Sequence, residues 1–400
     1  MKHFRVMLLC SLPFLSTSVH AAETASAPDP SATWDLTLLY PDEAAWSAAK
    51  SRLSAGIPKV KEFEGKLGES AGSLLAAMNY LQGLRQDYIR LAVYASLKLD
   101  ENTRDAASLE RQQEIGLLGT EISRATSFVD PELLAVGEAK LRGFLDQEPG
   151  LKPYRFTLLE TLRAAPHTLG AEAEAVLSAT SLVTATPGAL YGILANADMP
   201  WPTIKLSDGT EARLDQAGYT KWRAVANRAD RQAVFEAFWK KFRDYERTFG
   251  VALFSQVKTD WFNASTRKYP STLAAALDGN NIPEAVYRTL IAETNANLPT
   301  LHRYFKLRAR MLGLSDLRYW DIYPPIVSLE KAFPLATGKE LSIAAVAPLG
   351  PDYQKLYADS LSGRYTHYYP QPGKRSGAYM NGSVHDNHPY VLMNYNDDYE

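Results

Sequence analysis

The sequence feature that most constrains the fold is a run of apolar residues spaced by three and four positions between Gly68 and Leu99. The residues of this run are Leu74, Leu75, Met78, Leu81, Tyr88, Leu91, Tyr94 and Leu97. In a helix this spacing gathers the apolar side chains on one face. A face of that length is stable only when it packs against other helices, so the run predicts a mainly α-helical protein.

Several later segments repeat the helical period. Residues 102–128 show it in a more polar form, and Asp130-Pro131-Glu132 supplies a cap and a proline suited to the start of another helix. Between residues 230 and 262 the apolar positions are unusually aromatic, which predicts a helix face buried in a core. These positions are Phe235, Phe238, Trp239, Phe242, Phe249, Leu253, Val257 and Trp261.

The remaining helices are predicted from the positions of prolines. Residues 273–314 are expected to form helices divided at Pro283 and Pro299, and residues 343–361 one further helix. Short links between such helices favour antiparallel neighbours, so the predicted architecture is a large helical bundle.

Two segments depart from the helical period and predict β-structure. In residues 203–214 an Asp208-Gly209 turn joins two short segments, which is typical of a β-hairpin. Near the end of the chain, residues 389–395 alternate and follow a glycine-rich basic loop that begins at Gly373. A lone strand offers unpaired backbone N–H and C=O groups, so one reason for such a strand is an edge that accepts an extended peptide.

The N-terminus predicts an exported protein. Residues 1–21 contain basic residues, an apolar run and small residues before the expected cleavage point, as a secretory signal peptide does. Residues 22–32 form a polar linker, and cleavage would remove Cys10, the only cysteine. The expected location is the bacterial periplasm, with no membrane contact after cleavage. A net charge of −2 offers no general attraction for nucleic acid, so no nucleic-acid partner is expected.

Few residues could carry metal or nucleophilic chemistry. His385 and His388 stand three positions apart, but in an extended loop before Pro389 their rings would point in different directions, so they fail as a complete zinc site. A zinc-protease helix needs two histidines one turn apart with a glutamate beside the first, and the 400 residues contain no HExxH. The aromatic cluster around His367 suits either a cleft wall or a buried core.

Several motifs together resemble those of the oligoendopeptidase F family, which belongs with the thimet-oligopeptidase-like zinc peptidases. The resemblance spans about residues 33–400 and is most specific near the C-terminus. The motifs are Trp34-Asp35-Leu36 with Leu39-Tyr40, the turn at Asp208-Gly209, Tyr319-Trp320-Asp321-Ile322-Tyr323, Gly373-Lys374-Arg375-Ser376-Gly377-Ala378-Tyr379, and His388-Pro389-Tyr390-Val391-Leu392-Met393-Asn394-Tyr395.

The resemblance implies zinc-dependent hydrolysis of short peptides in a cleft, one side of which the helical bundle forms. In such peptidases an edge strand before the metal helix pairs with the substrate backbone, and residues 390–394 match that place. The implied substrate-binding residues are Gly377, Ala378, Tyr379, His388, Tyr390, Leu392 and Asn394. Gly377 and Ala378 would allow close backbone approach, although both are equally explained as residues of a tight turn.

One departure from the family pattern limits what this chain is expected to do. In the family an HExxH helix follows the Pro-Tyr strand, whereas this sequence ends at Glu400. We therefore expect a helical N-terminal domain over residues 33–200 and, over residues 201–400, the N-terminal part of a peptidase domain that lacks its catalytic zinc helix. The chain alone is expected to be inactive, with no catalytic residue and no metal ligand of its own.

The expected partners are short peptides and the missing C-terminal catalytic segment. Two alternatives come from other functional classes. One is a metal-free periplasmic peptide-binding protein that keeps the cleft wall, and the other is a helical scaffold without a ligand.

Overall fold

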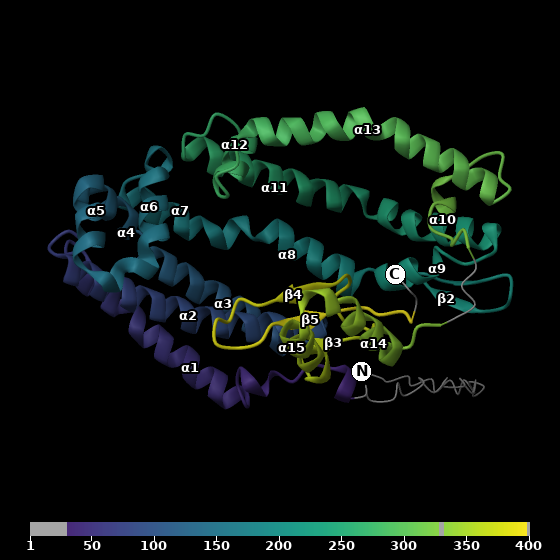
Figure 1. Cartoon of the computed structure of the whole chain (residues 1–400), viewed down its shortest axis with the longest axis horizontal. Coiled ribbons are helices and arrows are strands. Elements are labelled where there is room, and N and C mark those ends of the chain that lie inside the picture. The colour runs from purple at the N-terminus through teal and green to yellow at the C-terminus, as the bar shows by residue number, and fades with distance from the viewer. Residues whose placement is uncertain (1–29, 328–331, 398–400) are drawn as a thin grey trace, which may run out of the picture.

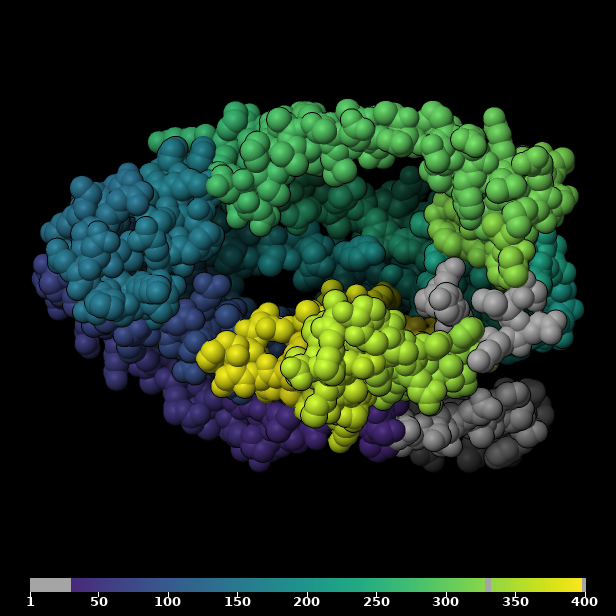
Figure 2. All heavy atoms as spheres, viewed as in Figure 1, coloured from purple at the N-terminus to yellow at the C-terminus, as the bar shows by residue number. Residues whose placement is uncertain are grey.

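The structure is a computed structural model that describes residues 30–327 and 332–397. It is mainly α-helical, as the periodicity predicts, and its helices surround a broad hollow (Figures 1 and 2). The helices are α1 (Glu43–Gly56), α2 (Ala71–Glu101), α3 (Ala106–Ala125), α4 (Val129–Val136), α5 (Glu138–Gln147), α6 (Arg155–Arg163), α7 (Ala171–Thr184), α8 (Thr186–Ile193), α9 (Gln216–Trp222), α10 (Arg228–Asp244), α11 (Glu246–Thr266), α12 (Thr272–Asp278), α13 (Glu284–Met311), α14 (Leu335–Ala345) and α15 (Pro351–Ser362).

The long helix predicted from the apolar run is α2, and it organises the N-terminal part of the molecule. Its first turn is capped by Ser70, whose hydroxyl accepts a hydrogen bond from the N–H of Ser73 at 3.0 Å. Leu74, Leu91 and Leu97 are fully buried. Their neighbours form what we call the N-terminal core, which consists of buried apolar side chains from residues 34–158 together with Val384, Tyr390 and Leu392.

A second core surrounds the predicted hairpin, which consists of β1 (Thr203–Lys205) and β2 (Glu211–Arg213). Gly209 takes a φ of 90° in the turn, a conformation that glycine adopts at little cost. The core contains Met199, Trp201, Leu206, Ala212, Leu214, Tyr219, Val234 and Phe238. Phe238 of α10 stacks on Tyr219 and on Trp201, with ring centroids 4.0 and 5.2 Å away.

Asp321 joins α10 to the end of α13 through its buried carboxylate and its backbone carbonyl. Asp321 is 0% exposed and accepts hydrogen bonds from Arg228 at 2.8 and 3.0 Å, from Arg231 at 3.1 Å and from the Arg318 N–H at 2.9 Å. Arg308, also buried, donates to the carbonyl oxygen of Asp321 at 2.9 Å. The aromatic motif at residues 319–323 is therefore fixed to two helices through its aspartate.

The C-terminal strands form a three-stranded sheet in the order β3 (Thr366–His367), β5 (Tyr390–Leu392) and β4 (Tyr379–Asn381). The central strand β5 is parallel to β3 and antiparallel to β4. Figure 1 shows this sheet lying along the N-terminal helices, where Tyr390 and Leu392 enter the N-terminal core. The division of the chain into domains at residue 200 remains a prediction.

Three predictions about helices are wrong. Helix α13 runs through Pro299 without a break, and residues 343–361 form two helices, because Pro348 and Pro351 interrupt them. The aromatic face of residues 230–262 is only partly buried. Phe238 is 4% exposed, but Trp261 is 64% exposed, and the buried residues of α11 are the small side chains Ala252 and Ala264.

One stretch of the described chain, Ala171–Asp198, is long and apolar enough to cross a membrane by length and composition alone. It comprises α7, α8 and a terminal π-turn. Its α7 part packs along α3 through the hydroxyl pairs Thr120–Ser181 and Ser123–Ser178, each at 2.9 Å. These contacts join α7 to α3.

Candidate functional site

The open edge of the C-terminal sheet is β4. The outer side of β3 is covered by the segment before α1 through backbone hydrogen bonds. The Tyr368 N–H donates to the carbonyl of Ala32 at 2.9 Å, and the Asp35 N–H donates to the carbonyl of Arg364 at 2.7 Å. No described strand pairs with the outer side of β4, and Met380 in its middle is 64% exposed. Strand β4 can therefore accept the backbone of another extended segment.

The prediction that residues 390–394 form the edge strand is wrong. Strand β5 is central, with Tyr390 1% exposed and Leu392 0% exposed, so neither side chain is available to a ligand at the surface. The Tyr390 hydroxyl donates instead to the carbonyl of Asp35 at 3.0 Å. Both residues hold the sheet on the N-terminal core, and their backbones pair with β4, which is the open edge.

Tyr379, the first residue of β4, is anchored to the N-terminal helices. Its hydroxyl donates to Asp100 of α2 at 2.6 Å, and the Arg375 guanidinium lies 3.4 Å from the same carboxylate. Burial raises the pKa of Asp100 above its ordinary value, against the opposing effects of Tyr379 and Arg375. Burial and the neighbouring Asp100 likewise raise the pKa of the Tyr379 hydroxyl. A neutral tyrosine therefore fixes one end of the open edge.

Asp100 was not among the residues predicted from the sequence. The available signal is its place in the last turn of a long helix, where the helix dipole disfavours a carboxylate. An acidic residue there needs a compensating partner, and that partner comes from a loop 275 residues further along the chain.

The loop before β4 is shaped by Asn394. Its side-chain amide donates to the carbonyls of Arg375 at 3.1 Å and Gly377 at 2.7 Å. Gly377 has a φ of 83°, which favours the interpretation of this residue as part of a turn. Ala378 is exposed beside it. Asn394 thus contributes by holding the loop in place.

Lys374 forms the buried base of the same loop. Its ammonium donates to the carbonyls of His367 at 3.1 Å, Tyr369 at 2.6 Å and Met393 at 2.5 Å. Burial lowers the pKa of Lys374 to about 7, whereas the three carbonyl oxygens favour the charged ammonium. Lys374 therefore ties the ends of β3 and β5 to the loop.

The histidines near β5 do not fit a zinc ion. His388 stacks on Tyr365 and donates from Nδ1 to the carbonyl of Pro389 at 3.1 Å, while His385 is exposed beside Asp386. Burial lowers the pKa of His388. Within residues 30–327 and 332–397, no group of three or more His, Cys, Asp or Glu side chains could hold a metal ion. His367 is 3% exposed and packs against Trp34, so its aromatic cluster belongs to the core.

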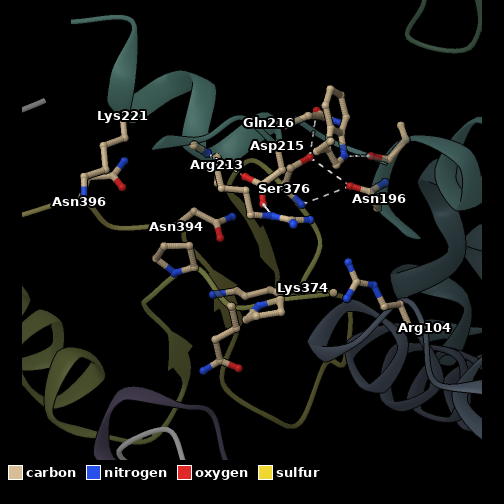
Figure 3. A pocket seen from close by; sticks show the side chains of 18 residues that line it. Arg104, Asn196, Arg213, Asp215, Gln216, Lys221, Lys374, Ser376, Asn394 and Asn396 are labelled. Carbon is tan, nitrogen blue, oxygen red and sulfur yellow. Dashed lines mark hydrogen bonds and ion pairs between the residues drawn. The ribbon is translucent and has the colours of Figure 1, made fainter. Parts of the chain in front are cut away.

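A cavity of about 270 Å³ opens beside the loop that precedes β4 (Figure 3). Its walls come from the turn between α2 and α3, from the π-turn at residues 194–198, from α9 and from the loop before β4. The polar side chains that line it are Arg104, Asn196, Arg213, Asp215, Gln216, Lys221, Gln371, Lys374, Ser376, Asn394 and Asn396. Ser376 is its link to the loop, because the serine hydroxyl lies 3.0 Å from Gln216 Oε1 and 3.2 Å from Asn196 Oδ1.

Curated proteins with similar sequences are oligopeptidases. Oligopeptidase PepF from Bacillus subtilis is 33% identical over 364 residues, which make up 91% of this chain and 54% of that protein. Group B oligopeptidase PepB from Streptococcus agalactiae is 32% identical over 364 residues, or 91% of this chain and 60% of that protein. This chain therefore spans between 54% and 60% of the length of these two relatives.

Solved structures show the same helical architecture. The crystal structure of oligoendopeptidase-F from Enterococcus faecium matches with a TM-score of 0.71 and 26% identity, over 80% of this chain and 65% of that one. The structure of PZ peptidase A with an inhibitor matches with a TM-score of 0.67 over 87% of this chain and 60% of that chain, and its 14% identity makes this a likeness of fold alone.

Two family models match the chain. The model described as Oligopeptidase F matches residues 132–200, and the model described as Peptidase family M3 matches residues 223–400, which include the helices from α10 to α15 and the whole C-terminal sheet. The sequence motifs, the fold and these matches agree with one another, and this chain belongs to the oligoendopeptidase F family.

Proposed function

We propose that this chain provides the peptide-binding part of a zinc-dependent oligopeptide hydrolase, and that the exposed edge of β4 binds the substrate backbone. The observation that carries the proposal is the position of β4, which is the unpaired edge of a sheet whose other edge is covered. An extended peptide can add to such an edge through main-chain hydrogen bonds, which require no particular side chain. Binding of this kind suits an enzyme that accepts many short peptides.

Hydrolysis itself requires groups that are not among these 400 residues. The sequence has no HExxH, and the described histidines do not fit zinc, so we derive no catalytic step from this chain. Zinc would supply an activated water and a polarised carbonyl in the complete reaction. The chain's own contribution in this proposal is to hold the peptide extended. We also propose export to the periplasm, on the basis of residues 1–21, which lie outside the described part of the structure.

The test is hydrogen exchange in the 400-residue chain with and without a short unstructured peptide. The backbone amide of Met380 should exchange more slowly when peptide is bound, because it faces the open side of β4 and gains a hydrogen-bond acceptor, whereas the amides of Tyr379 and Asn381 face β5. The matched control is the same peptide with N-methylated backbone amides, which keeps the side chains and removes the donors. Protection that survives N-methylation, or that falls elsewhere, would reject β4 as the docking strand.

The two alternative functions give different results in the same experiment. A peptide-binding protein without hydrolytic function would show the same protection, but this chain joined to a segment that carries an HExxH helix would not cleave the bound peptide in the presence of Zn²⁺. A scaffold without a ligand would show no protection at any peptide concentration.

A further inference from the structure

We propose that the cavity lined by Arg104 and Lys221 binds the C-terminal carboxylate of a peptide held on β4. This inference rests on the proposed function, because it concerns the same peptide and adds a contact that fixes its position along the strand. With this contact the chain would recognise the C-terminus of a peptide in addition to its extended backbone.

The charges of the cavity favour an anionic group. Two of its four basic residues are already neutralised or used, since Arg213 pairs with Asp215 at 3.1 Å and the Lys374 ammonium donates to three carbonyls. In the described chain neither Arg104 nor Lys221 forms an ion pair with a carboxylate. Figure 3 shows Arg104 on one side of the cavity and Lys221 on the opposite side. The field between them is positive and attracts an anion.

The cavity also offers amide groups beside those cations. Among the hydrogen bonds of the described residues, none uses the side-chain amide nitrogen of Gln216 or Asn396, and both side chains line the cavity. Asp215 is the single carboxylate in the lining, and it is occupied by Arg213 and by the N–H of Gly218 at 2.8 Å. A bound carboxylate would therefore meet donors on several sides.

The direction of the strand explains why the bound group would be a C-terminus. A peptide that adds to β4 in the antiparallel sense runs with its C-terminal end toward the start of β4, and the loop residue Ser376 leads from there into the cavity. A parallel peptide would bring its ammonium group to the same cations and be repelled. The charge of the cavity therefore selects the antiparallel orientation.

The spacing sets how many residues separate the paired segment from the carboxylate. Ser376 precedes Tyr379 by three residues, and because the loop turns at Gly377 the span is at most about 10 Å, the length of three extended residues. A peptide bonded to β4 would thus place its carboxylate in the cavity at most about three residues beyond the paired segment. The cavity has room for one terminal residue, at about 270 Å³.

The experiment measures binding of an N-terminally labelled peptide of about seven residues, long enough for both contacts, by fluorescence anisotropy with the 400-residue chain. The peptide is used with a free C-terminus, with an amidated C-terminus, and amidated with a final aspartate. We expect amidation to weaken binding about 10- to 100-fold, as loss of hydrogen bonds to a charged group would. The amidated aspartate peptide should bind as weakly as the amide.

The variants Arg104→Met and Lys221→Met should remove most of the difference between the free and amidated peptides. Arg85→Met and Lys59→Met are matched controls, because they remove the same charges at exposed positions on other parts of the surface and should leave the difference intact. Unchanged thermal unfolding of all four variants would show that each is folded.

Each other outcome overturns the inference in a distinguishable way. Equal binding of free and amidated peptides, with protection of β4 retained, rejects the carboxylate site and leaves the proposed function standing. Recovery of affinity by the amidated aspartate peptide shows that the cavity binds an acidic side chain, and rejects recognition of the C-terminus. Absence of binding by every peptide rejects both the carboxylate site and the proposed function.

Discussion

Replacing Asp321 with asparagine is expected to loosen the junction between α10 and α13 strongly. The buried carboxylate accepts hydrogen bonds from Arg228, Arg231 and the Arg318 N–H, and asparagine has one acceptor oxygen where aspartate has two. Arg231, whose side chain is 5% exposed, would keep its charge without a carboxylate partner. Removal of one partner from a buried ion pair costs about 3–5 kcal/mol.

Local hydrogen exchange is the appropriate measurement, because a chain with two cores is not expected to unfold in one step. A loss of 3–5 kcal/mol corresponds to roughly 100- to 4000-fold faster opening of the amides in α10 and around residue 320. Exchange in α2, which belongs to the other core, should change little.

The matched control is Asp316→Asn. Asp316 pairs with Arg318 at 2.6 Å, but the two side chains are 58% and 59% exposed, so this pair contributes about 0–1 kcal/mol. If the two variants accelerate exchange in α10 by similar factors of less than about tenfold, the argument that burial sets the strength of the Asp321 contacts is refuted.

Three further predictions concern the sheet and its loop. Tyr379→Phe removes a hydrogen bond to buried Asp100 and should lower the free energy of local opening of β4 by about 1–3 kcal/mol, measured by hydrogen exchange. Burial lowers the pKa of His367 to about 4, from an ordinary 6.5. The unfolded chain therefore binds a proton first as the pH falls, and between pH 6.5 and 4 the protein should lose stability, by about 2 kcal/mol at pH 5. Gly373→Ala should lower the free energy of local opening of the loop by about 1–3 kcal/mol in the same measurement, since φ is 84° and the new Cβ would clash with Asn102 Oδ1.

Each of these predictions has a control or a contrary result. Tyr353→Phe removes an exposed hydroxyl with no described hydrogen bond and should be neutral, so equal losses for both tyrosine variants would contradict the role of Asp100. The variant His367→Gln should lose less stability than the wild type between pH 7 and pH 5, and an unchanged loss would assign the pH dependence to other groups. Gly350→Ala, another glycine with positive φ and no atom within 4 Å of its new Cβ, separates backbone strain from the contact with Asn102.

The sequence predicted those elements that have long or strongly marked patterns. Helix α2 and the hairpin around Asp208-Gly209 were expected from periodicity and turn chemistry, and both are present. Strand β5 was expected as a strand but not as a central one. Its neighbours β3 and β4 have two and three residues, too few for an alternating pattern to be visible in a sequence.

Side-chain burial and long-range contacts were harder to predict. Trp261 and Leu253 have the spacing of a buried helix face but are exposed, because spacing indicates a shared face and not what covers it. The partner of Tyr379 is Asp100, a residue 279 positions away that has no motif of its own. The cavity beside Ser376 likewise draws its lining from segments whose proximity only the tertiary fold creates.

The position of β5 has a consequence for the order in which the molecule can fold. The N-terminal core is built from residues 34–158, yet Val384, Tyr390 and Leu392 complete it. During synthesis residues 34–158 leave the ribosome first. Part of the apolar interior of the N-terminal core therefore stays uncovered until more than two hundred further residues have been made. The nascent chain in that interval exposes apolar surface to proteases and to aggregation, so the docking of β5 is the step that completes the N-terminal core.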